Sequence, residues 1–242
     1  MGTLPNRTFL AVALACMIAA SGCSHERAGD ATATPDDSDG WISLFDGSTL
    51  DGWARRGGRA DFRVEDGQIV GSTRPHEPNG FLCTVREYSD FELELRFRTD
   101  QDLNSGVQFR SASLPDYQAG RVHGYQYEID PSPRAWTGGV YDEGRRGWLA
   151  SLESNPQARE AYRPHEWNQL RIVARGDHIR TWINGVPAAD FRDDLSPSGF
   201  IALQVHGVGD RLDPLEARWT AIRIRPITPP DSPGHESGAS AR

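Results

Sequence analysis

The chain of 242 residues contains no lysine, and all 26 of its basic residues are arginine. Schiff-base enzymes, pyridoxal-phosphate enzymes and P-loop nucleoside triphosphatases each require a lysine, so these classes are excluded. The arginines are scattered among 34 acidic residues, which leaves a formal net charge of −8 and no basic block. Nucleic acid is therefore not expected as a partner.

Cysteine is also scarce, with only Cys16, Cys23 and Cys83 in the chain. The first two belong to an N-terminal leader region, so Cys83 has no partner for an intramolecular disulfide. It lies in the apolar run Phe81–Val85 and is expected to be a small buried hydrophobic residue. The chain also lacks the Gly-x-Ser-x-Gly elbow of serine hydrolases and the His-x-x-x-His or Cys-x-x-Cys spacing of common zinc sites.

No apolar run is long enough to span a membrane permanently, although one near the N-terminus is typical of a secretory signal. It covers Phe9–Ala20 and ends in Ala20-Ser21-Gly22-Cys23, which resembles a bacterial lipobox. We therefore expect residues 1–22 to be a lipoprotein signal peptide and Cys23 to be lipidated, and a plain signal peptide is the alternative. The predicted location is the bacterial periplasm, with the lipid anchor in the membrane, and Ser24 favours the outer membrane.

The remainder divides into three parts by composition. Residues 23–40 are polar and rich in Ala, Thr, Asp and Ser, which predicts a flexible tether. Residues 41–227 form one domain, long enough for a sizeable core. Residues 228–242 are rich in Pro, Ser and Gly and are expected to be a disordered tail. The oligomeric state is not predicted.

A hydrophobic period of two dominates the domain and predicts an all-β fold. Phe91–Arg98 alternates strictly, and further strands are expected at 170–175, 179–183, 200–205 and 219–225. Turn pairs separate apolar runs at hairpin spacing: Asp66-Gly67, Gly176-Asp177 and Asn184-Gly185. Only residues 155–162 look helical, with Asn155 as N-cap and Pro156 at the first helical position. Many short antiparallel strands indicate a two-sheet sandwich or jelly roll.

The segment Gly124–Asp130 is the strongest functional signal. Side chains alternate along a strand, so Gln126, Glu128 and Asp130 should share one face. Residues two apart on a strand lie roughly 7 Å apart, within the range of paired acid–base carboxylates. The arrangement suits a sugar-binding cleft, and the alternative is a solvated face over packed Tyr125, Tyr127 and Ile129. The longest irregular segments are 75–80, 111–123, 131–139 and 145–164, and two of them flank this strand.

An ordered set of motifs resembles the domain of unknown function 1080. The motifs are Leu44–Trp53, Phe62–Gly67, Tyr88–Leu93, Asn104–Arg110, Gly124–Asp130, Thr137–Tyr141, Trp167-Asn168, Trp182–Val186 and Gly199–Gln204. Members of that family are described as 3-keto-disaccharide hydrolases, and as 3-keto-glucoside 1,2-lyases with 3-keto-2-hydroxyglucal hydratase activity. The resemblance implies a concanavalin-A-like jelly roll and a small carbohydrate substrate.

The implied chemistry starts from a ketone at C3 of the sugar, which acidifies the C2 proton. A base removes that proton, the enolate expels the C1 substituent, and water adds to the resulting glycal. The reaction needs a base, an oxyanion stabiliser and a proton donor for the leaving oxygen.

Candidate roles follow from motif position and residue chemistry. Glu128 or Asp130 is the expected base, with His206 as the rival, and Tyr141 would donate to the leaving oxygen. Arg110 would hold the enolate or a sugar hydroxyl. The other expected substrate-binding residues are Asn104, Gln126 and Gln204, with Trp136 and Trp148 stacking on a sugar face. No cofactor is required, although a hard divalent cation could bind Glu128, Asp130 or Asp142 through oxygen.

Two other functions remain open. A retaining glucanase of laminarinase type uses Glu-x-Asp-x-x-Glu, but here Glu128-Ile129-Asp130 is followed by Pro131-Ser132-Pro133, so the third glutamate is missing. A non-catalytic carbohydrate-binding lipoprotein module is the alternative from a different class. Dense ionisable groups in one cleft would favour the enzyme, and a flat aromatic strip would favour the binding module.

Overall fold

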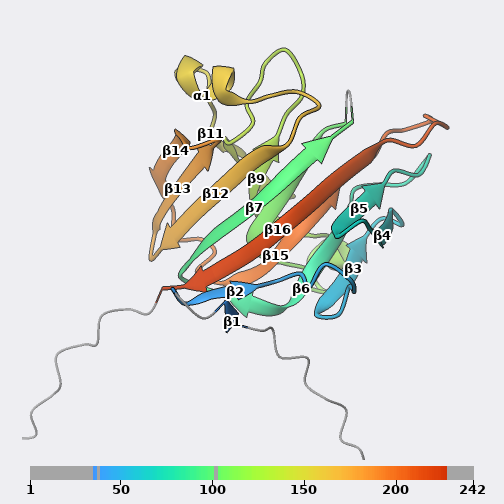
Figure 1. Cartoon of the computed structure of the whole chain (residues 1–242), viewed down its shortest axis with the longest axis horizontal. Coiled ribbons are helices and arrows are strands. Elements are labelled where there is room, and N and C mark those ends of the chain that lie inside the picture. Colours follow the sequence, from blue (N-terminus) through green and yellow to red (C-terminus); the bar gives the residue numbers. More distant parts are fainter. Residues whose placement is uncertain (1–34, 37–38, 101–102, 228–242) are drawn as a thin grey trace, which may run out of the picture. The chain divides into compact units, whose positions relative to one another are not determined.

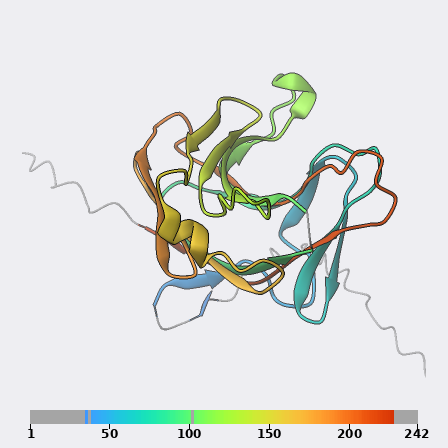
Figure 2. The same ribbon diagram turned by 90° about the horizontal axis from the view of Figure 1, so that it is seen from above.

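Two antiparallel β-sheets pack face to face in the computed structural model, which describes residues 35–36, 39–100 and 103–227 (Figures 1 and 2). Cys23, the expected signal peptide and the expected C-terminal tail lie outside the described residues, as does most of the expected tether. Within the described ranges, no helix is long and apolar enough to cross a membrane.

The first sheet has nine strands and faces the reader in Figure 1. Its main path runs β1 (Pro35–Asp36), β2 (Trp41–Ser43), β16 (Glu216–Pro226), β7 (Phe91–Thr99), β12 (Asn168–Arg175), β13 (His178–Ile183) and β14 (Val186–Arg192). A hairpin of β4 (Asp61–Glu65) and β5 (Gln68–Ser72) joins it through β16. Pro35 and Asp36 pair with Ile42 and Trp41, so two residues of the expected tether extend the sheet.

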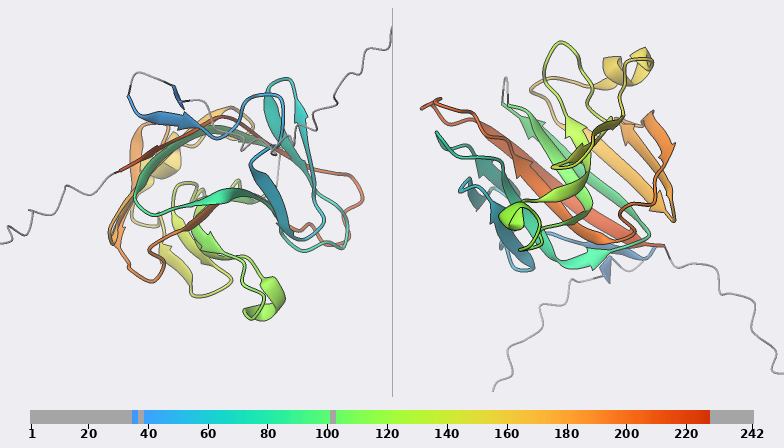
Figure 3. Two further views of the ribbon diagram at one scale, coloured as in Figure 1. Left: turned by 90° about the horizontal axis from the view of Figure 1, so that it is seen from below. Right: turned by 180° about the vertical axis from the view of Figure 1, so that it is seen from behind.

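The second sheet has seven strands and lies behind the first in Figure 1; the view from behind, in Figure 3, shows it directly. Its order is β11 (Gly147–Ala150), β10 (Val140–Glu143), β9 (His123–Ile129), β8 (Ser105–Ala112), β15 (Gly199–Val205), β6 (Gly80–Tyr88) and β3 (Trp53–Gly57). A 3₁₀ turn, Gln118–Gly120, lies in the loop before β9. Strand β11 falls inside segment 145–164, although the sequence predicts that segment to be irregular.

The expected strands and hairpins are confirmed. The pairs Asp66-Gly67, Gly176-Asp177 and Asn184-Gly185 connect β4 to β5, β12 to β13 and β13 to β14. The predicted helix is α1 (Pro156–Ala161), in which the Asn155 side chain accepts a hydrogen bond from the Ala158 amide at 3.1 Å. Such a cap satisfies a backbone amide that has no partner inside the helix.

The core lies between the sheets and follows from the alternation of the strands. On β7, Phe91, Leu93, Leu95 and Phe97 point inward and are at most 1% exposed. Burying a large apolar side chain stabilises the fold by about 1.5–3 kcal/mol, so this face fixes the register of the strand. A second, smaller apolar cluster, on the other face of the seven-stranded sheet, contains Cys83, as expected for a buried residue. Burial raises the pKa of the Cys83 thiol to about 12.

Candidate functional site

Strand β9 divides its side chains between the core and the outer face of the seven-stranded sheet. Tyr125, Tyr127 and Ile129 are fully buried in the core, so Gln126 and Glu128 project from the other face. The neighbouring strands β8 and β10 complete this face. Gly106 and Gln108 of β8 pair with Glu128 and Gln126, and Tyr141 of β10 pairs with Gln126 from the other side.

A pocket of about 400 Å³ opens over this face. Its walls come from eight strands and loops between residues 79 and 206. The lining residues are Asn79, Asn104, Arg121, Gln126, Glu128, Arg134, Tyr141, Glu143, Trp148 and His206. The pocket therefore combines carboxylates, guanidinium groups, amides, an imidazole and an indole, which is the density of ionisable groups expected of a catalytic site.

A chain of hydrogen bonds leads through this face to the Glu128 carboxylate. The Gln108 amide donates to Gln126 Oε1 at 2.5 Å, and Gln126 Nε2 donates to Glu128 Oε2 at 2.7 Å. Asn104 Nδ2 donates to the other carboxylate oxygen at 2.7 Å. Gly106 leaves room for this arrangement, because a Cβ atom there would lie 2.5 Å from Gln126 Cδ. Both oxygens of Glu128 are thus oriented before any substrate binds.

The environment of Glu128 favours its protonated form. The side chain is buried, and loss of hydration raises the pKa of Glu128 above the ordinary value. Hydrogen bonds from Asn104 and Gln126 lower it in part, the charge of Asp130 raises it further, and His206 lowers it. A carboxyl with a raised pKa that faces a pocket is suited to proton transfer near neutral pH.

Asp130 holds a loop instead of facing the pocket. It follows the last residue of β9, and its Oδ1 accepts from the Ser132 amide at 3.1 Å. Its Oδ2 accepts from Arg134 Nε at 2.8 Å and from the Trp136 amide at 3.2 Å. Burial alone would raise the pKa of Asp130, but these hydrogen bonds together lower it. Asp130 is not among the lining residues, so the expected Glu128–Asp130 pair is not brought together in the pocket.

The loop that Asp130 holds and the strands β10 and β11 together form an aromatic and cationic wall. The Arg134 guanidinium carbon lies 4.7 Å from the ring centroid of Trp136 and 5.2 Å from that of Trp148. Trp148 makes edge contacts with both Trp136 and Tyr141. Of these residues, Arg134, Trp148 and Tyr141 line the pocket, and Trp136, which is not among the lining residues, packs against Arg134 and Trp148.

His206 lies in the pocket, close to the end of β15. Its Nδ1 is 2.8 Å from the Gly207 carbonyl oxygen. A carbonyl can only accept a hydrogen bond, so in the neutral ring Nδ1 carries the proton and Nε2 is left as an acceptor. The ring is exposed, in contrast to the buried Glu128.

Arg110 and Gln204 are not among the residues that line the pocket. A bulge in β8 places Arg110 at φ +46, and its guanidinium donates to Ser89 O, Gly176 O and Asp90 Oδ1 at 2.6, 2.7 and 2.9 Å. The expected contact of Arg110 with an enolate or sugar hydroxyl is therefore corrected to a structural role. Gln204 is fully buried between Gly106 and Phe81, and no described residue hydrogen-bonds its side-chain amide.

Four lining residues were not singled out from the sequence: Asn79, Arg121, Arg134 and Glu143. Strand alternation could have predicted Glu143, because it lies two residues after Tyr141 on β10 and so shares the face of Tyr141. The other three lie outside the strands, and periodicity says nothing about where loop side chains point.

The possible metal ligands are separated. Asp142 lies on the opposite face of β10 from Tyr141, and its two oxygens accept from Arg145 at 2.7 Å and Arg146 at 2.5 Å. Among residues 35–36, 39–100 and 103–227, no group of three or more His, Cys, Asp or Glu side chains is placed to hold a metal ion.

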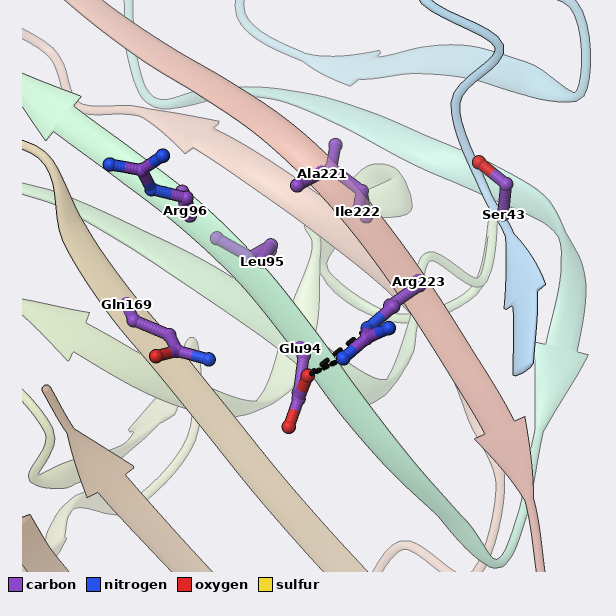
Figure 4. A pocket seen from close by; sticks show the side chains of 8 residues that line it. All are labelled: Ser43, Glu94, Leu95, Arg96, Gln169, Ala221, Ile222 and Arg223. Carbon is purple, nitrogen blue, oxygen red and sulfur yellow. Dashed lines mark hydrogen bonds and ion pairs between the residues drawn. The ribbon is translucent and has the colours of Figure 1, made fainter. Parts of the chain in front are cut away.

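A second pocket, of about 270 Å³, lies on the outer face of the nine-stranded sheet (Figure 4). It forms where β16 changes register between Thr220 and Arg223, with Ala221 at φ +50. Its acidic residue Glu94 is already paired with Arg223 at 2.6 Å (Figure 4). The Glu128 pocket therefore carries more of the groups that chemistry on a sugar needs.

Two antiparallel sheets packed in this way place the chain in the class of concanavalin-like β-sandwich folds. Residues 40–225 match the model of the 3-keto-alpha-glucoside-1,2-lyase-like domain, so the chain belongs to this family. It is 24% identical over 234 residues to a 3-keto-disaccharide hydrolase of Bacteroides thetaiotaomicron, and the match covers 74% of this chain and 78% of that protein.

Solved structures confirm the fold. A protein described as a candidate glycosyl hydrolase from Parabacteroides distasonis is similar with a TM-score of 0.56 and 19% identity, covering 78% of this chain and 94% of that one. A Bacillus subtilis protein with a galectin-like fold gives a TM-score of 0.55 at 11% identity, covering 73% and 90%. Together with family membership, these findings support a carbohydrate-related hydrolase or lyase.

Proposed function

We propose that the chain cleaves 3-keto-glycosides by removing the C2 proton and eliminating the substituent at C1, with hydration of the glycal to follow. One observation carries this proposal. Glu128 is a buried carboxylate that lines the pocket, it is oriented by two amide donors, and its pKa is raised by burial. A base with these properties fits a C–H bond that the neighbouring ketone has acidified.

The remaining requirements of the reaction find candidates in the same pocket. Arg134 uses Nε for Asp130 and has further N–H groups with which to hold the enolate oxygen that forms at C3. Tyr141 and Trp148 offer ring surfaces against which a sugar can pack. His206 Nε2 is the rival base. Because the ring is exposed, we expect it to contact a sugar hydroxyl at the pocket entrance and not to act as the base.

The test compares a 3-keto-glucoside with its unoxidised parent glucoside, using the purified protein with and without EDTA. We expect aglycone release from the keto sugar alone. Cleavage of both sugars would point to a glucanase, and binding without cleavage would point to a carbohydrate-binding module. Loss of activity in EDTA would add a divalent cation to the site.

The role of Glu128 is tested by Glu128→Gln, which keeps the shape of the side chain and removes the base. Loss of a general base is expected to slow turnover by about 10²–10⁴-fold. His206→Ala is the matched comparison and is expected to retain turnover within a few-fold. The reverse order of effects would assign the base to His206.

The cellular location belongs to the same proposal: lipidation at Cys23 anchors the protein in the bacterial outer membrane, facing the periplasm. The support is the Ala20–Cys23 motif and Ser24. Fractionation of cells with and without Cys23→Ala tests it, since the variant should move from the membrane to the soluble fraction. A variant that stays with the membrane would contradict the lipid anchor.

A further inference from the structure

We propose that Glu143 is the acid that protonates the leaving oxygen, and that the same group then activates water for hydration. This inference rests on the proposed function above and assigns a role that elimination requires. It replaces Tyr141, which is the donor predicted from the sequence for this step. Glu143 lines the same pocket as Glu128 and is 8% exposed.

The strand register sets the distance between the two carboxylates. Glu143 of β10 pairs with Gly124 of β9, Tyr141 pairs with Gln126, and Glu128 lies one step further along β9. Each step of two residues spans roughly 7 Å, so the backbone positions of the two glutamates are about 14 Å apart along the strands. Two side chains that lean over the pocket from these positions can stand on either side of one sugar ring. Tyr141 lies between the two glutamates, opposite Gln126.

The surroundings of Glu143 suit a group that alternates between acid and base. Burial raises the pKa of Glu143, while the charges of Arg121 and His206 and the nearby donors of Arg121 and Asn79 lower it in part. The Arg121 guanidinium lies 3.7 Å from the carboxylate, as a loose ion pair. A carboxyl held this way can give up its proton and is then stabilised as an anion.

A carboxyl also fits the chemistry better than the other donors. A sugar alkoxide is a poor leaving group, and a phenol is a weaker acid than a carboxylic acid by about six pKa units. Proton donation is most effective from a group whose pKa lies near the working pH. Tyr141 is also engaged edge-on with Trp148, which is a packing role.

The protons balance over the whole cycle. In elimination, Glu128 takes the C2 proton, the C2 electron pair forms the C1–C2 double bond, and the C1–O bond electrons go to the leaving oxygen as Glu143 protonates it. In hydration, ionised Glu143 takes a proton from water while the water oxygen forms a bond to C1. Protonated Glu128 then returns a proton to C2. Both side chains end in the states in which they began.

The experiment uses Glu143→Gln with two 3-keto-glucosides that differ only in leaving group. Nitrophenolate leaves without a proton, whereas methoxide needs one. We expect the variant to release nitrophenolate within a few-fold of the wild-type rate, and to cleave the methyl glycoside at least about 10²-fold more slowly. The 2-hydroxy-3-keto-glycal should also accumulate with the nitrophenyl substrate, because hydration has lost its base.

Four controls make the result decisive. Glu128→Gln should cleave both substrates slowly. Glu160→Gln, at an exposed position on α1, should cleave both substrates at the wild-type rate. Glu143→Gln should still exchange the C2 proton in D₂O, and Glu143→Asp should recover part of the methyl-glycoside activity. Equal slowing of both substrates by Glu143→Gln, slowing of neither, or loss of C2 exchange would each overturn the role. A wild-type protein inactive on both substrates would instead refute the proposed function.

Discussion

At the residue scale, the site depends on how one carboxylate is held. Glu128 receives one amide donor on each oxygen, from Asn104 and Gln126, although neither donor carries a charge. A guanidinium in the same place would fix the group as an anion and weaken it as a base. Neutral donors orient the carboxylate and leave the effect of burial dominant, so its pKa stays raised.

The raised pKa predicts how stability depends on pH. The folded state keeps the Glu128 proton at pH values where the unfolded chain has released it. This contribution to stability is fully present below the ordinary pKa of glutamate and is lost as the pH rises through the raised value. Glu128→Gln has no such group, so the Tm of this variant minus that of the wild type should grow with pH over that window. Thermal unfolding at a series of pH values measures it, and a constant difference would contradict the prediction.

Gly106 provides a second prediction at this scale. In Gly106→Ala the new Cβ would lie 2.5 and 2.6 Å from Gln126 Cδ and Cγ, so the Gln126 side chain must move. The fold should survive, because a flexible side chain gives way, but the donor to Glu128 is displaced. We expect kcat to fall by about tenfold or more, in the range of a lost charge-assisted hydrogen bond. The control compares kcat of Gln126→Ala with kcat of the double variant Gly106→Ala/Gln126→Ala. A lower kcat in the double variant would mean that Gly106 acts through a group other than Gln126.

At the element scale, the alternation of apolar and polar residues predicted most of the long strands but only part of the site. It gave β7, β12, β13, β15 and β16 and the shared face of Gln126 and Glu128, since one buried face dictates the period. It failed for Asp130, because β9 ends at Ile129 and the next side chain turns into the loop. It failed for Arg110, where a bulge breaks the period.

The loop after β9 gives the prediction for this scale. Asp130→Asn keeps the size of the side chain but weakens its bonds to Arg134 and to the Trp136 amide. Because Asp130 positions Arg134, which is proposed to hold the enolate oxygen, we expect kcat to fall several-fold and KM for the keto sugar to rise. Near-UV circular dichroism should report loosening of Trp136 and Trp148. A fall in kcat as deep as that of Glu128→Gln, with KM unchanged, would make Asp130 a catalytic residue after all.

At the scale of the whole molecule, the two sheets are joined by more than the apolar core. Arg110 leaves β8 of the seven-stranded sheet and donates to Gly176 O, in the turn between β12 and β13 of the other sheet. It also binds Ser89 O and Asp90 in the turn between β6 and β7. Such a contact depends on how the sheets stack, and a sequence pattern within single strands carries no information about it.

The same contact predicts a large loss of stability without a direct loss of chemistry. Arg110 is 1% exposed, so Arg110→Met leaves two backbone carbonyls without their donor and leaves Asp90 without its charged partner, although Asp90 Oδ1 still accepts from the Gly176 amide. Removing one partner of a buried ion pair costs about 3–5 kcal/mol, and we expect about 3 kcal/mol because Asp90 is partly exposed. Arg192→Met is the matched control, since Arg192 and its partner Asp177 are 65% and 48% exposed, and it should change stability by less than about 0.5 kcal/mol. Urea unfolding measures both. Turnover of the keto sugar by the folded Arg110→Met protein should stay within a few-fold of wild type, whereas a deep loss of turnover with unchanged stability would return Arg110 to the site.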